Sequence, residues 1–486
     1  MKKSFLFNVL FLVFVNLLVK PFWIFGIDRT VQNRLGEAEF GLFFAIFNFT
    51  YLFQILLDFG FQNFNNREVA ANTKRINELL PSILLFKTIL FLIYLVICIA
   101  LAYPLGYLSN TFIYIILINQ ILLSFNIYLR SNVSAHQHFI TDALLSILDK
   151  LLMIAFCLVL LYGNVSGFQL SIFNFALAQM AAYLITFFVC LFFAFRLTEK
   201  LIFNFSITDF KKIAKETMPY AIIHFLMTTY YRIDGVMLEK LQGANGALES
   251  GIYAQSYRIM EALNNIGYLF AGILLPLFAY HLTQKNEIKS LLKSSISIMF
   301  CVSTSIVICF FWYKNDIIQL LYTASNVAYS AEVFGYLLLN FFPVAILYVI
   351  GTLLTANQNF KLMIYTLVVA VLLNVVLNVY LITEYGAKGA GISTFITQLF
   401  MLGCYSIYSI QIFKLRWNWA YFLRLSLFIS LCLLWVYVLQ SYAFAMHPAL
   451  NLGIHFIVYF IGIPVFAWIS GLVNKHTFQL KIGTQQ

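Results

Sequence analysis

Charged side chains stand inside several long apolar runs of this sequence. The acids are Asp58, Asp149, Asp234 and Glu261, and the cations are Lys20, Lys87, Lys150, Arg232 and Arg258. A charge surrounded by hydrocarbon is strongly unfavourable unless it faces protein or water. We therefore expect these side chains to face the interior of a helix bundle or a water-filled cavity, where the cations would attract anions.

Asp58 lies in the stretch 28–72, where a polar turn leads into an apolar run. On one continuous helix, an arc of about 120° would collect a stripe of polar side chains. Its members are Asn48, Tyr51, Gln54, Asp58, Gln62 and Asn65. Two roles are open for Asp58. It changes protonation as a cavity opens and closes, or it forms a fixed salt bridge with Lys20 or Lys87.

A purely structural explanation is also open for the other charges. Arg258 and Glu261 stand three residues apart, so they can neutralise each other on one helix face. For Lys20, Lys87 and Arg232 this explanation is weaker, because no carboxylate lies within one turn on the same face.

Residue patterns typical of enzymes and metal sites are absent from the sequence. It contains no Gly-rich phosphate loop, no Cys/His cluster and no Ser-His-Asp arrangement with supporting spacing. The seven cysteines all stand in apolar runs, without the spacing of metal ligands. We therefore expect no catalytic residue, no cofactor and no metal.

The elements that position the charges are membrane-spanning helices. Hydrophobic residues make up 62% of the 486 residues and charged residues 10%, against about 25% charged in soluble domains. Apolar runs of about 20 residues cross a bilayer as helices. We predict an all-α polytopic membrane protein with about fourteen transmembrane helices, at residues 5–27, 40–62, 79–102, 111–129, 144–163, 170–195, 219–238, 251–275, 294–312, 331–355, 362–382, 390–413, 421–440 and 450–473.

The distribution of Lys and Arg predicts the orientation. With the N-terminus inside, most basic residues fall in inside loops, as the positive-inside rule requires. We predict that both termini are cytoplasmic. The net charge of +11 then reflects interaction with the lipid bilayer, and we expect no nucleic-acid partner.

Short motifs recur in the two halves of the chain. Residues 134–139 resemble 355–360, residues 40–43 resemble 250–253, and Asp28 falls against Asp234. We infer a parallel repeat of two six-helix lobes, 1–195 and 219–413, around a central cavity. A cytoplasmic amphipathic linker, 196–218, joins the lobes, with a helix that starts at Thr208 or Asp209. Residues 414–486 add spans 13 and 14 and a cytoplasmic tail.

Three stretches carry a resemblance to a known family. They are 32–72, 232–270 and 353–398, and the last holds an Asn374-x-x-x-Asn378 pattern followed by Tyr-Gly-Ala-x-Gly-Ala at 385–390. Together they resemble the multidrug/oligosaccharidyl-lipid/polysaccharide exporter superfamily, and within it the Wzx-type O-antigen/polysaccharide flippases. Residues 382–384 are Ile-Thr-Glu, where that family commonly has a Pro.

The resemblance implies a transporter without enzymatic activity in the bacterial cytoplasmic (inner) membrane. Such a flippase moves undecaprenyl-pyrophosphate-linked oligosaccharide to the outer leaflet by alternating access, for O-antigen, capsule or exopolysaccharide biosynthesis. The polysaccharide polymerase is an expected partner, and H⁺ or Na⁺ an expected coupling ion. Carried over by position, the substrate-binding cations are Lys20, Arg29, Arg34, Arg232 and Arg258.

The resemblance also suggests roles for other residues. The cavity acids available for ion coupling are Asp58, Asp149, Asp234 and Glu261, and Pro21 and Gly26 would let the first span bend. Two alternatives remain open. An ion-coupled multidrug extruder of the same superfamily would want an acid-rich cavity, whereas the charges here lean cationic. A membrane glycosyltransferase or polymerase would usually carry a large extracytoplasmic loop, and none is evident.

Overall fold

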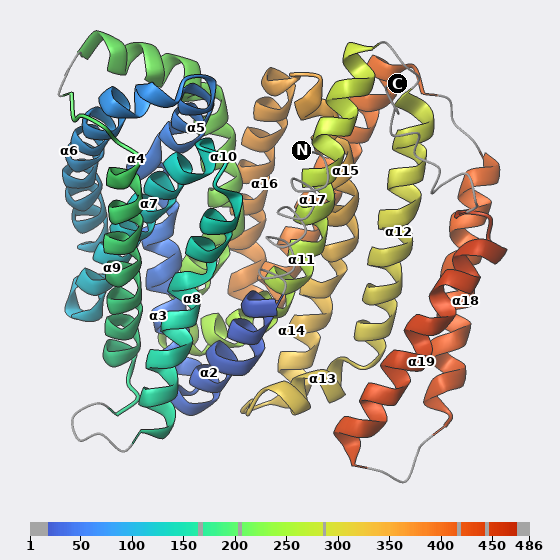
Figure 1. Ribbon diagram of the computed structural model, residues 1–486. Helices are drawn as coiled ribbons and strands as arrows, with labels where there is room; N and C mark the ends of the chain where they lie inside the picture. The colour runs from blue at the N-terminus through green and yellow to red at the C-terminus, as the bar shows by residue number, and fades with distance from the viewer. Residues whose placement is uncertain are drawn as a thin grey trace. The chain divides into compact units, whose positions relative to one another are not determined.

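The computed structural model describes residues 18–163, 169–202, 207–284, 288–415, 419–442 and 447–473. Every regular element in these ranges is a helix (Figure 1), and eleven helical segments among them are long and apolar enough to cross a membrane. The predicted all-α membrane fold is confirmed. Most of the predicted first span, residues 203–206 just before the predicted linker helix, and the C-terminal tail after residue 473 lie outside the described residues.

The chain forms two compact units, Met1–Ala254 and Gln255–Gln486. The main helices of the first unit are η1 (Phe22–Asp28), α2 (Arg29–Leu35), α3 (Glu37–Leu52), α4 (Ile55–Asp58), α5 (Phe61–Ala71), α6 (Ile76–Ala102), α7 (Phe112–Ala135), α8 (Phe139–Tyr162), α9 (Ile172–Arg196), α10 (Ile207–Leu241) and the start of α11 (Gly246–Thr283). Short 3₁₀ turns, η2 (Thr73–Arg75), η3 (Tyr107–Ser109) and η4 (Gly243–Asn245), connect some of them.

The second unit holds the rest of α11 and the helices that follow it. These are α12 (Ile288–Trp312), α13 (Lys314–Leu321), α14 (Val327–Leu339), α15 (Phe341–Ala356), α16 (Phe360–Tyr385), α17 (Ala387–Phe413), α18 (Trp419–Gln440) and α19 (Pro448–Ile469). The limits of the lobes inferred from the repeat differ from the limits of these units and stay a prediction.

Some predicted spans differ in detail from the observed helices. The predicted span 40–62 is not one helix, because the chain leaves helical geometry after α3 and again after α4. The predicted span 219–238 is the later part of α10, which runs unbroken from Ile207 through the region predicted as a linker helix. The predicted span 331–355 is divided at Asn340 into α14 and α15.

In the first unit, α3 and the start of α11 approach each other through two glycines. A Cβ on Gly41 would lie 1.9 Å from the carbonyl oxygen of Ala247, and a Cβ on Gly251 would lie 1.9 Å from that of Glu37. Ala247 stands four residues before Gly251, and Glu37 stands four residues before Gly41. Each glycine therefore packs against the helical turn that precedes the other glycine, and the contact is reciprocal. Only glycine lets two helix backbones come this close. Gly41 and Gly251 are also matched in the internal repeat.

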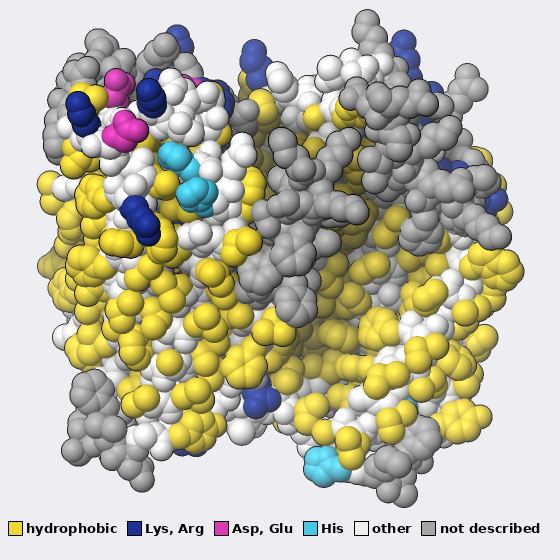
Figure 2. Space-filling model, viewed as in Figure 1, with side chains coloured by type: hydrophobic (Ala, Val, Ile, Leu, Met, Phe, Trp, Pro, Cys, Tyr) yellow, Lys and Arg dark blue, Asp and Glu magenta, His cyan; other side chains and the backbone are white. Residues whose placement is uncertain are grey.

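Much of the outer surface of each unit is apolar. Figure 2 shows hydrophobic side chains over large parts of the surface that is not drawn in grey, with most of the visible charged side chains near the upper and lower edges of the view. Large apolar residues on the helix exteriors are strongly exposed, among them Val96 at 68% and Val376 at 67%. Contiguous apolar surface of this kind is not stable in water, and lipid acyl chains would cover it.

Candidate functional site

The break in the second predicted span creates a polar site inside the first unit. α4 ends because Phe59 and Gly60 adopt left-handed backbone conformations, with φ of 46° and 83°, which turn the chain out of the helix. The carbonyl oxygen of Leu57 then accepts hydrogen bonds from Lys87 Nζ at 2.7 Å and Ser124 Oγ at 3.1 Å. A cation at the C-terminal end of a helix is favoured by the helix dipole, so Lys87 stabilises the break.

Lys87, on α6, also forms a salt bridge with Asp58. Nζ lies 3.3 Å from Oδ1, and the Lys87 side chain is 1% exposed against 28% for Asp58. The rings of Phe125 and Tyr128 on α7 each lie 5.7 Å from the ammonium. The geometry therefore matches the fixed pair with Lys87 that the sequence left open as one of two roles for Asp58.

The continuous polar stripe predicted along span 2 is wrong, because the helix is interrupted between its members. Asn48 lies on α3, Asp58 ends α4 and Asn65 lies on α5. Asn65 instead faces α7, where its Nδ2 donates hydrogen bonds to Ser131 Oγ and Asn132 Oδ1. It connects helices in the way that polar groups do inside membrane bundles.

Arg232 on α10 reaches across to α3. Its Nη1 donates to Asn48 Oδ1 at 3.2 Å, and its Cζ lies 4.6 Å from the ring centre of Tyr51 and 5.9 Å from that of Phe47. Gly235 makes this approach possible, since a Cβ there would lie 2.6 Å from Asn48 Nδ2. An amide and two ring faces hold the guanidinium of Arg232 in a fixed orientation.

Lys150 on α8 lies at the meeting point of three elements. Its Nζ is 3.4 Å from Oδ2 of the neighbouring Asp149. The ammonium lies 5.8 Å from the ring centre of Trp23 in η1 and 5.6 Å from that of Tyr183 on α9. Asp149, which the sequence predicted as a cavity acid, is thus a partner of Lys150.

A series of aromatic rings connects these two cations. We call it the aromatic row: Trp23, Phe175, Phe43, Phe47 and Tyr51. Trp23 stacks on Phe175 at 6.4 Å, and Phe175 meets Phe43 edge-on at 5.3 Å. Phe43 stacks on Phe47 at 6.1 Å, and Phe47 lies 5.8 Å from Tyr51. Lys150 contacts the Trp23 end and Arg232 contacts the Phe47–Tyr51 end. Both cations therefore belong to one feature, which is built from η1, α3, α8, α9 and α10.

The other cations predicted near the first span lie on or beside η1 and α2. Lys20 is half-buried just before η1, which is wound as a π-helix after Pro21. Wide π turns are frequent at functional sites, and this one includes Gly26, where a bend of the first span stays a prediction. Arg29 opens α2, and its buried Nε has no hydrogen-bond partner in the described part of the chain. Arg34 is exposed, with its Cζ 5.8 Å from the ring centre of Tyr162.

Two acids of the first unit are almost completely buried. Asp234 on α10 is 1% exposed and accepts a hydrogen bond from Tyr253 Oη at 2.8 Å. Asp28 is also 1% exposed and accepts one from Gln32 Nε2 at 2.9 Å. Asp234 was predicted from the sequence to be a cavity acid. Asp28 was not predicted to have such a role, although the internal repeat aligns it with Asp234.

In the second unit, Arg258 and Glu261 form the pair that their spacing predicted, with Nη1 and Oε2 2.8 Å apart. The Asn-x-x-x-Asn pattern also has a local function. Asn378 Nδ2 donates to Asn374 Oδ1, and Asn374 Nδ2 donates to Ser393 Oγ on α17. The pattern therefore holds α16 against α17.

The arrangement in the first unit suits noncovalent binding of anions. Among the described residues, no group of three or more His, Cys, Asp or Glu is placed to hold a metal ion. What the unit offers is buried or half-buried cations on aromatic faces, the kind of environment in which charge-assisted hydrogen bonds to phosphate are strong. The aromatic row was not predicted, because its rings come from helices far apart in the sequence.

Comparisons with known proteins give a family and a fold. Residues 5–282 match the model of a family described as polysaccharide biosynthesis protein. No curated protein sequence matches the chain.

Among solved structures, the lipid II flippase MurJ in an inward closed conformation matches with a TM-score of 0.74 at 14% identity, over 95% of this chain and 98% of that one. An inward-facing MATE-family multidrug resistance transporter matches with a TM-score of 0.58 at 16% identity, over 83% and 94%. A transporter from Pyrococcus furiosus, described as a member of the MOP superfamily, matches with a TM-score of 0.55 at 13% identity, over 84% of this chain and 93% of that one. At these identities the matches establish the fold alone.

Proposed function

The chain belongs to the polysaccharide biosynthesis protein family, and from that premise we propose that it is a flippase for undecaprenyl-pyrophosphate-linked oligosaccharide. It moves this lipid-linked unit from the cytoplasmic to the outer leaflet of a bacterial inner membrane, for O-antigen, capsule or exopolysaccharide synthesis. Both termini are cytoplasmic in this proposal. A polysaccharide polymerase then takes the unit on the outer side.

The observation that carries the proposal is the aromatic row with Lys150 and Arg232 at its ends. A pyrophosphate that leaves water needs cations that are already oriented, and both side chains are held on ring faces by fixed contacts. Arg29 adds a buried Nε donor that has no partner in the described residues. Phe47 and Tyr51, the partly exposed rings of the row, suit the apolar faces of sugar rings. Trp23, Phe175 and Phe43 are buried and hold the row together.

The remaining predicted residues take secondary roles in this proposal. Lys20 and Arg34 flank the π-helical η1 and guide the headgroup toward the row. The substrate-binding role predicted for Arg258 stays a prediction. Alternating access bends the first span at η1. An H⁺ or Na⁺ gradient drives the cycle through the buried acids, of which Asp234 is more enclosed than Asp58.

The test follows the lipid-linked sugars in cells that lack the gene. Undecaprenyl-pyrophosphate sugars should accumulate in the cytoplasmic leaflet, where a membrane-impermeant glycosidase reaches them in inverted vesicles but not in spheroplasts. The wild-type gene should restore outer-leaflet exposure, and Arg232→Ala should not.

Arg67→Ala is the matched control, because Arg67 is 64% exposed and lies outside the aromatic row. The proposal fails if lipid-linked sugars reach the outer leaflet without the protein. It also fails in its residue assignment if Arg232→Ala restores transport as fully as Arg67→Ala at equal protein levels.

A further inference from the structure

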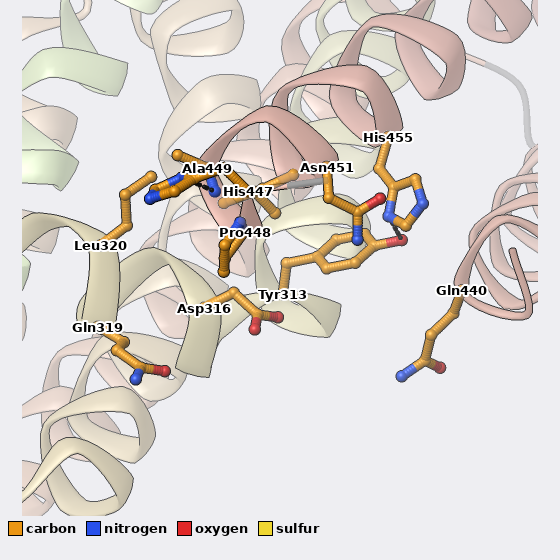
Figure 3. Close-up of a pocket in the computed structure, with 11 residues that line it drawn as sticks. Tyr313, Asp316, Gln319, Leu320, Gln440, His447, Pro448, Ala449, Asn451 and His455 are labelled. Atoms are coloured by element: carbon orange, nitrogen blue, oxygen red, sulfur yellow. Dashed lines mark hydrogen bonds between the residues drawn. The ribbon is translucent and has the colours of Figure 1, made fainter. Parts of the chain in front are cut away.

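A pocket of about 370 Å³ opens in the second unit between α13, the end of α18 and the start of α19 (Figure 3). Its polar lining includes Asp316 and Gln319 from α13, Gln440 from α18 and Asn451 from α19. Figure 3 shows Asp316 and Asn451 close to the ring of Tyr313. The pocket is separate from the aromatic row, which belongs to the first unit.

One wall of the pocket is rigid because Tyr313 and His455 fix each other. Both are 5% exposed, and Tyr313 Oη lies 3.1 Å from His455 Nδ1. Burial raises the pKa of Tyr313 to about 12, so its hydroxyl stays protonated and donates to Nδ1. His455 Nε2 then donates to the backbone oxygen of Tyr442 at 2.9 Å. These contacts connect α13 and α19 with the chain just after α18.

Two further side chains are held with hydrogen-bonding capacity to spare. Gln440 Oε1 accepts from Trp312 Nε1 at 2.6 Å, which leaves its amide NH₂ available as a donor. His447 Nδ1 accepts from the backbone N–H of Ala449 at 3.3 Å, which caps α19 and leaves Nε2. Asp316 forms no ion pair within the described residues, so its carboxylate remains an open acceptor.

The chemistry of the lining selects against anions. Among the described residues that line the pocket there is one carboxylate and no Lys or Arg, so a phosphate group would be repelled. Amides, imidazoles and a carboxylate together offer both donors and acceptors, which is what a ligand covered with hydroxyl groups requires. Leu320 and Leu452 add apolar surface for its C–H groups.

We infer that this pocket is a binding site for a neutral or amino sugar, on the outer side of the membrane in the predicted topology. The choice of a sugar over other small polar molecules rests on the proposed function. This pocket receives the sugar end of the lipid-linked oligosaccharide after the oligosaccharide has crossed the membrane. The phosphate would be held by cations outside the pocket.

The test uses the full-length protein in lipid nanodiscs and saturation-transfer NMR with free sugars. Glucosamine and N-acetylglucosamine should receive saturation from the protein, and glucuronate should receive much less. Asp316→Asn should weaken glucosamine binding about tenfold, the size expected when a hydrogen bond to a charged group is lost, and N-acetylglucosamine binding by less. Gln319→Ala should weaken both.

Glu332→Gln is the matched control. Glu332 is a 48% exposed acid of the same unit that pairs with Lys388 and does not line the pocket. The inference is overturned if no sugar receives saturation from the wild-type protein, or if Asp316→Asn and Gln319→Ala both behave like Glu332→Gln. A protein that restores leaflet crossing but binds no free sugar would refute the pocket alone. One that binds sugar without restoring crossing would refute the flippase proposal alone.

Discussion

Replacing Gly41 with Ala should separate two helices that now touch through their backbones. The added Cβ would lie 1.9 Å from the carbonyl oxygen of Ala247 and 2.4 Å from the backbone nitrogen of Gly251. Neither atom can move as a flexible side chain would. The only relief is a displacement of α3 from α11.

The size of the effect follows from this distance. Close carbon–oxygen contacts between helices have lengths of about 3.3 Å, so the helices would separate by roughly 1.4 Å at this point. Forcing extra volume into a tight contact destabilises by about 1–3 kcal/mol, and a backbone clash belongs at the upper end. The better helix propensity of Ala returns about 1 kcal/mol. We expect a net loss of about 2 kcal/mol, or roughly 4–8 °C in Tm for a unit of this size.

The assay is thermal unfolding of the purified protein in detergent, beside Gly272→Ala. Gly272 lies on α11, and no atom lies within 4 Å of the site of its Cβ, so that variant should be as stable as the wild type or slightly more so. Gly251→Ala should match Gly41→Ala. The double variant should lose less than the sum, since one separation accommodates both methyl groups. Equal Tm values for Gly41→Ala and Gly272→Ala would refute the close contact, and additive losses would refute its reciprocity.

Three further outcomes are expected. A cysteine at position 110 should react with an impermeant maleimide added outside intact cells, and one at position 74 only after permeabilisation; the reverse pattern would invert the topology. Arg232→Lys should keep part of the transport activity in the leaflet assay, because a point charge remains although the planar contacts to Tyr51 and Asn48 do not; complete loss of transport would show that the guanidinium itself is needed. Asn374→Ala should lower stability by about 1–3 kcal/mol in thermal unfolding by leaving its buried partners unsatisfied, and an unchanged Tm would show that the Asn pattern is not structural.

The fold was predictable to the extent that the bilayer dictates it. A span needs a minimum length of apolar residues, and that requirement is visible in the sequence one run at a time. The Arg258–Glu261 pair was predictable for a similar reason, because its three-residue spacing is local to one helix. Arg232 was recognised as unusual, but its contact with Asn48 joins residues 184 positions apart, and no local pattern encodes that contact.

The aromatic row was hidden by its composition. The chain has 52 Phe and 29 Tyr residues, and most of them could equally face lipid. Only tertiary packing distinguishes Phe43, which is 2% exposed, from Phe188, which is 59% exposed. The break after α4 was hidden in another way. Gly60 signals a possible turn, but an apolar run with a single Gly is also typical of an intact membrane helix.

The break also changes what Asp58 can do. As the last residue of α4 it faces Lys87, whose side chain is 1% exposed. Protonating Asp58 would leave a buried ammonium that keeps its hydrogen bonds to Leu57 and Ser124 but loses its counter-charge. Removing one partner of a buried pair typically destabilises by about 3–5 kcal/mol, whereas replacing both with apolar groups is often neutral. Asp58 is partly exposed, so we expect a smaller loss for Asp58→Asn.

The double variant Asp58→Asn/Lys87→Met separates the two roles of the acid. It should recover part of the stability that Asp58→Asn loses, because no charge is left buried without its partner, although the Leu57 carbonyl also loses a donor. Recovery of Tm without recovery of a pH-gradient response in transport would support a coupling role built on the same pair. If Asp58→Asn has the wild-type Tm and still responds to an imposed pH gradient, Asp58 neither stabilises the fold through Lys87 nor couples transport to protons.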